Sequence, residues 1–318
     1  MRERERVFIL ANPIAGRGEG ASIAHRLRDR LHRAGLDVEI FFEPPDCFEL
    51  ARLGRNTRAA VVIGGDGTLR AVAHRLFLDP CQPQSSGPLQ GSPPAEPPLL
   101  IVPLGTANLM GRHLGIRWDQ GSVEEQVAQA IARHRVVRLD TARANDRLFL
   151  LMAGVGFDAH VVHELDRLRR GPINIASYIA PALSALQNYR YPPIRVVVDS
   201  HELFGPEPAV AFIGNLPEYG TGFPILPKAR ADDGVLDVCV LPCRNVQDLL
   251  RLFLMAATGE HLLAEGVAYA KGRHVRVTAP DGAEVPVQVD GDPAGHAPVE
   301  IDMLPIRLPF IVPAAPGQ

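Results

Sequence analysis

The chain has 318 residues, a formal net charge of −3, 46% hydrophobic residues and 22% charged residues. This length suggests one large domain or two ordinary ones, and the composition is that of a globular chain. The weak net charge, without a basic and aromatic stripe, gives no support to nucleic-acid binding. No apolar run approaches the roughly 18 residues that a membrane-spanning helix needs.

The N-terminal sequence and the cysteines predict a cytoplasmic protein. The charged start, Met1 to Arg6, lacks an apolar core, so no signal peptide is expected. The four cysteines form no zinc-type spacing and are expected to be reduced. Lysine is almost absent, with only Lys228 and Lys271, and arginine carries nearly all the positive charge. Codon bias of a GC-rich genome is the simplest explanation.

The first part of the chain alternates strands and helices. Apolar runs predict strands near 7–11, 37–42, 59–63 and 99–102. Helices are predicted near 19–34, 46–54, 68–78, 106–114 and 121–134. This alternation predicts an α/β domain over residues 1–135, with a parallel, doubly wound sheet. A Pro-rich stretch at 79–98 interrupts it and is interpreted as a surface insertion.

The pattern changes from about residue 136. Short apolar or alternating runs, punctuated by turn residues, predict a mainly antiparallel β-sandwich over 136–304. The strands are expected near 136–139, 148–152, 195–198, 209–213, 236–241, 274–277 and 287–289. Helical insertions are expected at 157–168, 174–189 and 245–257.

The most informative motif is Gly64-Gly65-Asp66-Gly67-Thr68, between a buried strand and a helix. Glycine lets the backbone approach a phosphate closely, and the helix start offers N–H groups and the positive end of its dipole. The motif therefore predicts a nucleotide phosphate site. Two glycines in such a turn can also serve packing alone, so the other segments matter.

Three further segments support a ligand site. Asn12-Pro13-Ile14-Ala15-Gly16 and Pro103-Leu104-Gly105-Thr106-Ala107-Asn108 each follow a predicted strand. In doubly wound sheets, ligands bind at such carboxyl ends of strands. The third segment, Asp232 to Val238, is followed later by Asp290-Gly291-Asp292.

In this order and spacing, the segments resemble the diacylglycerol kinase catalytic family, which includes bacterial lipid kinases and sphingosine kinases. The resemblance extends from Asn12 to about Asp292. It implies an ATP-dependent lipid kinase that acts in a cleft between two domains, with the last strand, near 305–313, returning to the first domain. The nucleotide-binding residues that it implies are Asn12, Pro13, Gly16, Gly64, Gly65, Asp66, Gly67, Thr68, Thr106 and Asn108.

The resemblance also implies the metal and catalytic residues. Asp233, with the carbonyls of Arg230 and Val235, matches a Mg²⁺ site, and one carboxylate, two carbonyls and water suit that ion. Asp292 matches the general base. Asp66 is expected to bind the reacting Mg²⁺ or to orient the acceptor hydroxyl.

The sequence departs from the family pattern at three places. Arg70-Ala71 stands where most members have Asn-Glu, Leu109 where most have Asp, and Asp292 where most have Glu. A non-catalytic nucleotide or lipid sensor is therefore an alternative, and NAD kinase is another. The identity of the lipid and the oligomeric state, a homodimer included, stay open. Without a predicted membrane span, a lipid kinase must work peripherally, at the membrane surface.

Overall fold

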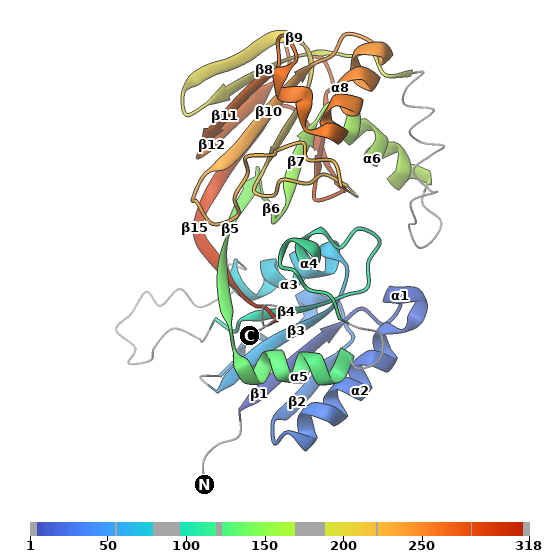
Figure 1. The fold of residues 1–318 in the computed structure, drawn as a ribbon, viewed down its shortest axis with the longest axis vertical. Coiled ribbons are helices and arrows are strands. Elements are labelled where there is room, and N and C mark those ends of the chain that lie inside the picture. Colours follow the sequence, from blue (N-terminus) through green and yellow to red (C-terminus); the bar gives the residue numbers. More distant parts are fainter. Residues whose placement is uncertain are drawn as a thin grey trace. The chain divides into compact units, whose positions relative to one another are not determined.

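The computed structural model describes residues 5–54, 56–78, 96–118, 123–168, 188–220, 222–280 and 282–313. The chain divides into two compact units, unit 1 (Met1–Leu139 with Arg307–Gln318) and unit 2 (Asp140–Ile306). Figure 1 shows the fold of each unit. Most of the predicted insertion and nearly all of the predicted helix at 174–189 lie outside the described residues.

Unit 1 is built on a parallel sheet, as predicted. Its strand order is β2-β1-β3-β4-β15, and neighbouring strands pair in parallel. The strands are β1 (Arg6–Ala11), β2 (Asp37–Phe41), β3 (Thr57–Gly64), β4 (Leu99–Pro103) and the end of β15 (Val299–Ile311). β15 joins through Phe310, opposite Leu99. The last strand thus completes the N-terminal sheet.

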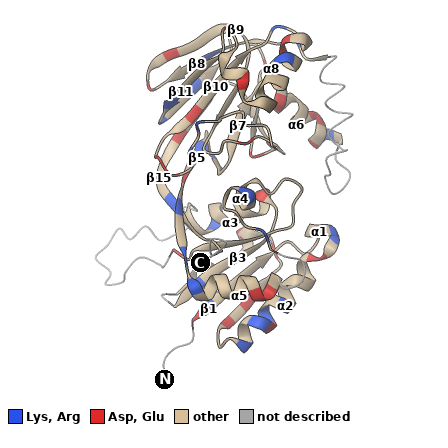
Figure 2. Cartoon of the chain, in the orientation of Figure 1, with Lys and Arg blue, Asp and Glu red and all other residues tan. Residues whose placement is uncertain are grey.

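Helices pack against this sheet because its strands are apolar on both faces. Alternate residues of β1 and β3, such as Ile9 and Val61, form one core with α2 (Gly20–Arg33) and α5 (Val123–Arg133). The remaining helices are α1 (Ala15–Gly18), α3 (Asp66–Phe77) and α4 (Leu109–His113). Arg30 of α2 pairs with Glu125 of α5 at 2.5 Å, and blue and red segments meet there in Figure 2.

The predicted helix at 46–54 is wrong. The segment contains two 3-10 turns, Pro45–Cys47 and Leu50–Arg52, separated by extended backbone at Phe48. Phe48 is buried and meets Phe41 edge-on, with ring centroids 4.8 Å apart. Burial of this ring against the sheet breaks the helical pattern.

Unit 2 is an antiparallel two-layer structure, as predicted. One layer contains β5 (Val136–Ala144), β6 (Arg147–Phe149), β8 (Pro193–Val198), β12 (His274–Thr278) and β15. The other contains β7 (Met152–Val155), β10 (Leu236–Pro242), β11 (Ala268–Gly272), β13 (Pro286–Val289) and β14 (Asp292–His296). The long strand β9 (His201–Gly214) pairs in both layers, and apolar residues of both form the core.

Two described helices, α6 (Phe157–Leu168) and α8 (Val246–Thr258), agree with the expected insertions. A short 3-10 segment, Glu260–Leu263, follows α8. Strands β11 and β14 were not predicted from the sequence, because Ala-Tyr-Ala-Lys-Gly forms one and Asp-Pro-Ala-Gly-His forms the other. Pairing with neighbouring strands overrides weak strand propensity here.

Candidate functional site

Two of the predicted glycine turns of unit 1 lie against each other, backbone to backbone. A Cβ on Gly105 would lie 2.6 Å from the Cα of Gly65, and one on Gly65 would lie 3.0 Å from the Cα of Gly105. Real Cβ atoms do not approach as closely as 2.6 Å, and 3.0 Å is already a tight contact, so a side chain at either position requires its neighbours to move. Gly64 is constrained as well, because its Cβ would lie 2.6 Å from the hydroxyl oxygen of Thr68.

Asp66 joins the same two turns through its carboxylate. Its Oδ2 accepts the backbone N–H of Leu109 at 2.9 Å, and its Oδ1 accepts that of Met110 at 3.1 Å. These N–H groups belong to the first turn of α4. Burial raises the pKa of Asp66, and the backbone N–H groups oppose that rise. The Asp66 carboxylate therefore connects the two turns.

Asn108 completes the second turn. It takes a left-handed conformation with φ of 50°, and its side chain accepts the N–H of Gly105 at 2.8 Å and donates to the carbonyl of Gly105 at 2.7 Å. The left-handed residue explains why α4 begins at Leu109 rather than at 106 as predicted. Thr106 is exposed in this turn.

The Asn12 turn lies beside the other two. Asn12 donates its N–H to the carbonyl of Ile63, at the end of β3, at 2.9 Å. Its side-chain oxygen accepts the N–H of Ile14 at 3.1 Å, across the half-buried Pro13. Gly16 has a φ of 60°, and its Cβ would lie 3.3 Å from the side chain of Leu104. All three predicted nucleotide turns thus gather at one edge of the sheet.

This edge offers the chemistry of a phosphate site. Gly65 caps α3, and Asp66, Gly67 and Thr68 form its first turn. The N–H groups of a helix's first turn have no partner within the helix and point toward the positive end of its dipole. An anion is stabilised there, and the closely packed glycines leave the backbone accessible to it.

Asp292, the predicted base, lies in unit 2 at the start of β14. It is half-buried and pairs with Val289 across the β13–β14 hairpin. Asp290, in the turn before it, accepts the N–H groups of Leu150, Leu151 and Met152 at 2.9 to 3.1 Å. Asp290 therefore anchors the turn that carries Asp292.

The predicted metal loop, residues 230 to 235, also lies in unit 2. Asp233 faces Lys271, with 2.8 Å between Oδ2 and Nζ, and its Oδ1 accepts the N–H of Val235 at 3.3 Å. Arg230 is exposed and pairs with Asp232. Among the described residues, no group of three His, Cys, Asp or Glu side chains could hold a metal ion. The hydrogen bond to Asp233 raises the pKa of Lys271, so the side chain stays protonated at neutral pH.

Unit 2 also buries a carboxyl group, Asp158, in the first turn of α6. One oxygen accepts the side-chain N–H of Gln288 at 3.1 Å, and the other has no hydrogen-bond partner. Burial raises the pKa of Asp158 to about 7. Gln288 also accepts the N–H of Gly291, which links this carboxyl group to the Asp290 turn.

Comparisons with known proteins agree with the resemblance. The model of the diacylglycerol kinase catalytic domain matches residues 6–144, and that of the YegS C-terminal NAD kinase beta sandwich-like domain matches residues 152–312. The chain belongs to the diacylglycerol kinase catalytic family. A diacylglycerol kinase of Mycobacterium tuberculosis is 29% identical over 97% of this chain and 95% of its own length.

Other family members are similar over equal lengths. A diacylglycerol kinase of Bacillus subtilis is 24% identical over 97% of each chain. The crystal structure of a diacylglycerol kinase from Bacillus anthracis shares the fold, with a TM-score of 0.67 at 24% identity over 98% of each chain. None of the helices within the described ranges is long and apolar enough to span a membrane.

Two of the departures from the family pattern lie at buried or half-buried positions of unit 1. Leu109 is 8% exposed, so its side chain packs inside unit 1 while its N–H is held by Asp66. Ala71 is half-buried on α3. The acidic groups expected of most family members are replaced by apolar side chains at these two positions.

Sequence reasoning missed Lys271, Asp158 and Asp290. Asp158 gave no signal, because a lone Asp in the first turn of a helix is ordinary. Asp290 was noticed only as part of Asp-Gly-Asp. For Lys271 a signal existed: it is one of the two lysines in the chain.

Proposed function

We propose that this protein is an ATP-dependent, Mg²⁺-requiring lipid kinase, which transfers the γ-phosphate to the hydroxyl of a diacylglycerol-like lipid. The observation that carries the proposal is the contact between Gly65 and Gly105, which joins two phosphate-type turns beside the start of α3. Family membership over both halves of the chain supports a lipid kinase in general. Such an activity belongs to phospholipid metabolism.

The residues take the following roles in the proposal. Backbone N–H groups of Gly65 to Thr68 hold the nucleotide phosphates, and the Asn12 turn and Thr106 line the nucleotide. Asp292 accepts the proton of the lipid hydroxyl. The hydroxyl oxygen bonds to the γ-phosphorus while the bond from the γ-phosphorus to the bridging oxygen breaks, and ADP leaves. Mg²⁺ neutralises charge on the phosphates when it is bound, and the remaining lone pairs of Asp66 would hold it.

The test is transfer of radiolabelled phosphate from ATP, with Mg²⁺, to a panel of lipids in mixed micelles. The panel contains diacylglycerol, phosphatidylglycerol, a sphingoid base and a polyprenol. We expect label on one lipid class and a loss of about 10²- to 10⁴-fold in turnover for Asp292→Asn, because a general base contributes that much. Asp146→Asn, a change at an exposed carboxylate of unit 2, is the matched control and keeps full turnover.

The burial of Leu109, where a carboxylate is usual, favours one second candidate, a non-catalytic nucleotide or lipid sensor. A sensor binds ATP and labels no lipid. Nucleotide binding without transfer to any lipid of the panel would replace the kinase proposal with this one. Full activity of Asp292→Asn would keep the kinase and overturn the role of Asp292 as its base.

The proposal includes peripheral contact with the membrane. Leu250 and Leu254, one turn apart on α8, are exposed, and so is Leu263 in the neighbouring 3-10 segment. Exposed apolar side chains grouped in this way are typical of surfaces that meet lipid or protein. They offer a place for the kinase to reach a lipid substrate at the membrane surface.

A further inference from the structure

Lys271, on β11, places its ammonium group among three oxygen atoms of unit 2. Its Nζ lies 2.8 Å from Oδ2 of Asp233 and 3.3 Å from Oδ2 of Asp237. It also donates to the backbone carbonyl of Lys228 at 3.1 Å. The contact with Asp237 is ionic and lacks hydrogen-bond geometry. Two carboxylates and a carbonyl are the oxygen ligands that a hard metal cation would take.

The burial of Asp237 favours a cation here. Its side chain is 0% exposed, and its other oxygen accepts the hydroxyl of Tyr269 at 2.6 Å. A buried carboxylate is destabilising unless it is paired and hydrogen-bonded. Lys271, at 37% side-chain exposure, supplies the positive charge from the solvent side.

The loop around Asp233 is held by other protein groups as well. The Arg273 side chain donates to the carbonyl of Gly234 at 2.9 Å, and a carboxylate oxygen of Asp140 accepts the N–H of Gly234 at 2.6 Å. The loop thus takes its shape from side chains of β5, β11 and the residue that follows β11.

A Mg²⁺ ion does not fit this arrangement. Oδ1 of Asp233 accepts the N–H of Val235, as the oxygens of Asp66 accept N–H groups, but Oδ2 of Asp233 is already paired with the ammonium group of Lys271. A divalent ion bound to Asp233 would displace the ammonium group or lie beside it, and like charges in contact repel strongly. The residues present therefore do not favour the Mg²⁺ site at Asp233 that the family resemblance implied.

The use of lysine at this place is selective. The chain has 33 lysines and arginines, of which only Lys228 and Lys271 are lysines, and both lie in this cluster. The Nζ of Lys228 lies 5.3 Å from the ring centre of Tyr269. An ammonium is a compact point charge that three oxygens can surround, whereas a guanidinium is a planar fork.

We propose that the Lys271 ammonium is the resident cation of this loop and that the loop binds no divalent metal. The ammonium neutralises Asp233 and Asp237 together and closes the loop onto β11. The claim concerns unit 2 alone and does not rest on the kinase proposal.

Binding of Mn²⁺, measured by electron paramagnetic resonance on the full chain without nucleotide or lipid, tests the proposal. We expect wild type and Asp233→Asn to bind the same amount of Mn²⁺. Millimolar Mg²⁺ or EDTA should leave the wild-type Tm unchanged. A Mn²⁺ ion that wild type binds and Asp233→Asn loses would overturn the proposal.

Lys271→Met removes the charge and keeps the length of the side chain. Its Tm should fall by about 3–8 °C, because a buried carboxylate loses its cation. Arg230→Met is the matched control, since it removes a positive charge from the same loop without touching Asp233, and it should keep the wild-type Tm. An unchanged Tm for Lys271→Met would also overturn the proposal. If that variant does not fold, the wild-type Mn²⁺ comparison decides alone.

Discussion

The two units hold their turns together in different ways. In unit 1, turns approach because side chains are absent, as at Gly65 against Gly105 and at Gly20, where a Cβ would lie 2.2 Å from the carbonyl oxygen of Asn12. In unit 2, carboxylates hold the turns in place by accepting backbone N–H groups. Asp290 accepts three such groups, and Asp199 accepts those of Arg273 and His274.

This difference suits the two roles that we propose for the units, phosphate binding in unit 1 and positioning of a catalytic carboxylate in unit 2. A phosphate needs backbone N–H groups at close range, and a side chain at the contact would push them away. A loop that carries a catalytic carboxylate needs only a fixed position. Asp66 is the exception in unit 1, since it combines a close glycine turn with a carboxylate that accepts N–H groups.

The largest effect on nucleotide binding is expected where a Cβ would separate the two turns of unit 1. In Gly105→Ala, the new methyl would lie 2.6 Å from the Cα of Gly65 and 2.8 Å from Oδ1 of Asn108. Overpacking of this kind costs about 1–3 kcal/mol. We expect the KM for ATP to rise about 10- to 100-fold, because displaced N–H groups bind phosphate less well. Steady-state kinetics at saturating lipid measure this.

Gly54→Ala is the control for that variant. Gly54 also lies in unit 1, and its Cβ would meet nothing within 4 Å. Its KM for ATP should equal that of wild type. Equal values for Gly105→Ala and wild type would show that the close approach does not position the phosphate site.

An effect on stability alone is expected at Asp158 of unit 2. Its pKa is about 7 in the folded chain and 3.8 without perturbation. The folded state therefore holds the proton more tightly, and stability falls as pH rises from about 4 to about 7. The difference of about three pKa units corresponds to about 4 kcal/mol. Asp158→Asn cannot ionise and keeps an acceptor for Gln288, so it should lose this pH dependence.

Urea denaturation at about pH 5 and about pH 8 measures the effect. Wild type should be less stable at the higher pH, and Asp158→Asn should gain stability relative to wild type there. Asp166→Asn, an exposed change on the same helix, should follow wild type at both values. Parallel pH profiles for wild type and Asp158→Asn would refute the assignment.

Much of the fold could be predicted because its signals are local. The apolar run before Gly64 and the helical pattern after Asp66 are both visible within a few residues, and they place the phosphate-type turn correctly between β3 and α3. The sandwich was read from alternation and turn residues in the same way. The error at 46–54 arose where burial of Phe48 against distant strands outweighed the local pattern.

The contacts of the candidate site could not be predicted, because they join distant residues. Asp66 meets an N–H group 43 residues later, and Lys271 meets a carboxylate 38 residues earlier. No periodicity encodes such pairs. The motif therefore identified Asp66 as important, and only the structure shows that both its oxygens hold the start of α4.

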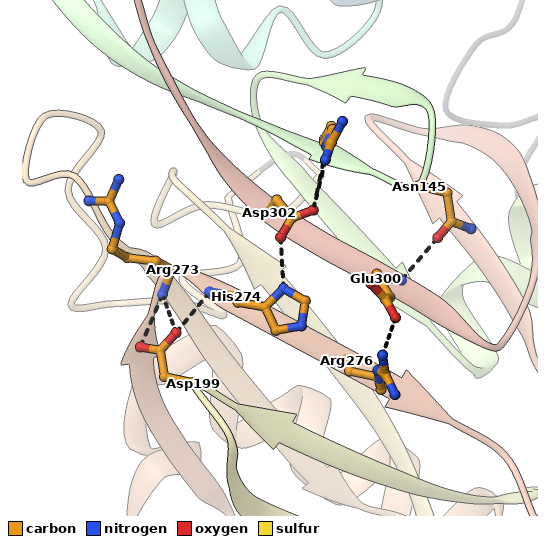
Figure 3. A network of polar contacts seen from close by, with 8 residues as sticks. Asn145, Asp199, Arg273, His274, Arg276, Glu300 and Asp302 are labelled. Atoms are coloured by element: carbon orange, nitrogen blue, oxygen red, sulfur yellow. Dashed lines mark hydrogen bonds and ion pairs between the residues drawn. The ribbon is translucent and has the colours of Figure 1, made fainter.

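The smallest effect is expected at the surface of unit 2, in the polar network of Figure 3. The side chain of His274 is hydrogen-bonded to Asp302 at 2.7 Å, and this contact holds the pKa of Asp302 below its usual value. A lowered carboxyl pKa adds stability above the unfolded value, near 4, and that stability is lost as pH falls through the folded value. The Asp302 side chain is 32% exposed, so solvent screening limits the gain in stability.

Asp302→Asn should therefore cost about 0.5–1 kcal/mol at neutral pH, and the difference from wild type should vanish in acid. Urea denaturation at about pH 7 and about pH 3 measures it. Glu202→Gln, which breaks a half-exposed pair with Arg195 at 3.3 Å, is the control and should cost less. If Asp302→Asn costs no more than this control, the network in Figure 3 is held by the β12–β15 backbone pairing rather than by its side chains. Carboxylates would then stabilise unit 2 only where they accept backbone N–H groups or are buried.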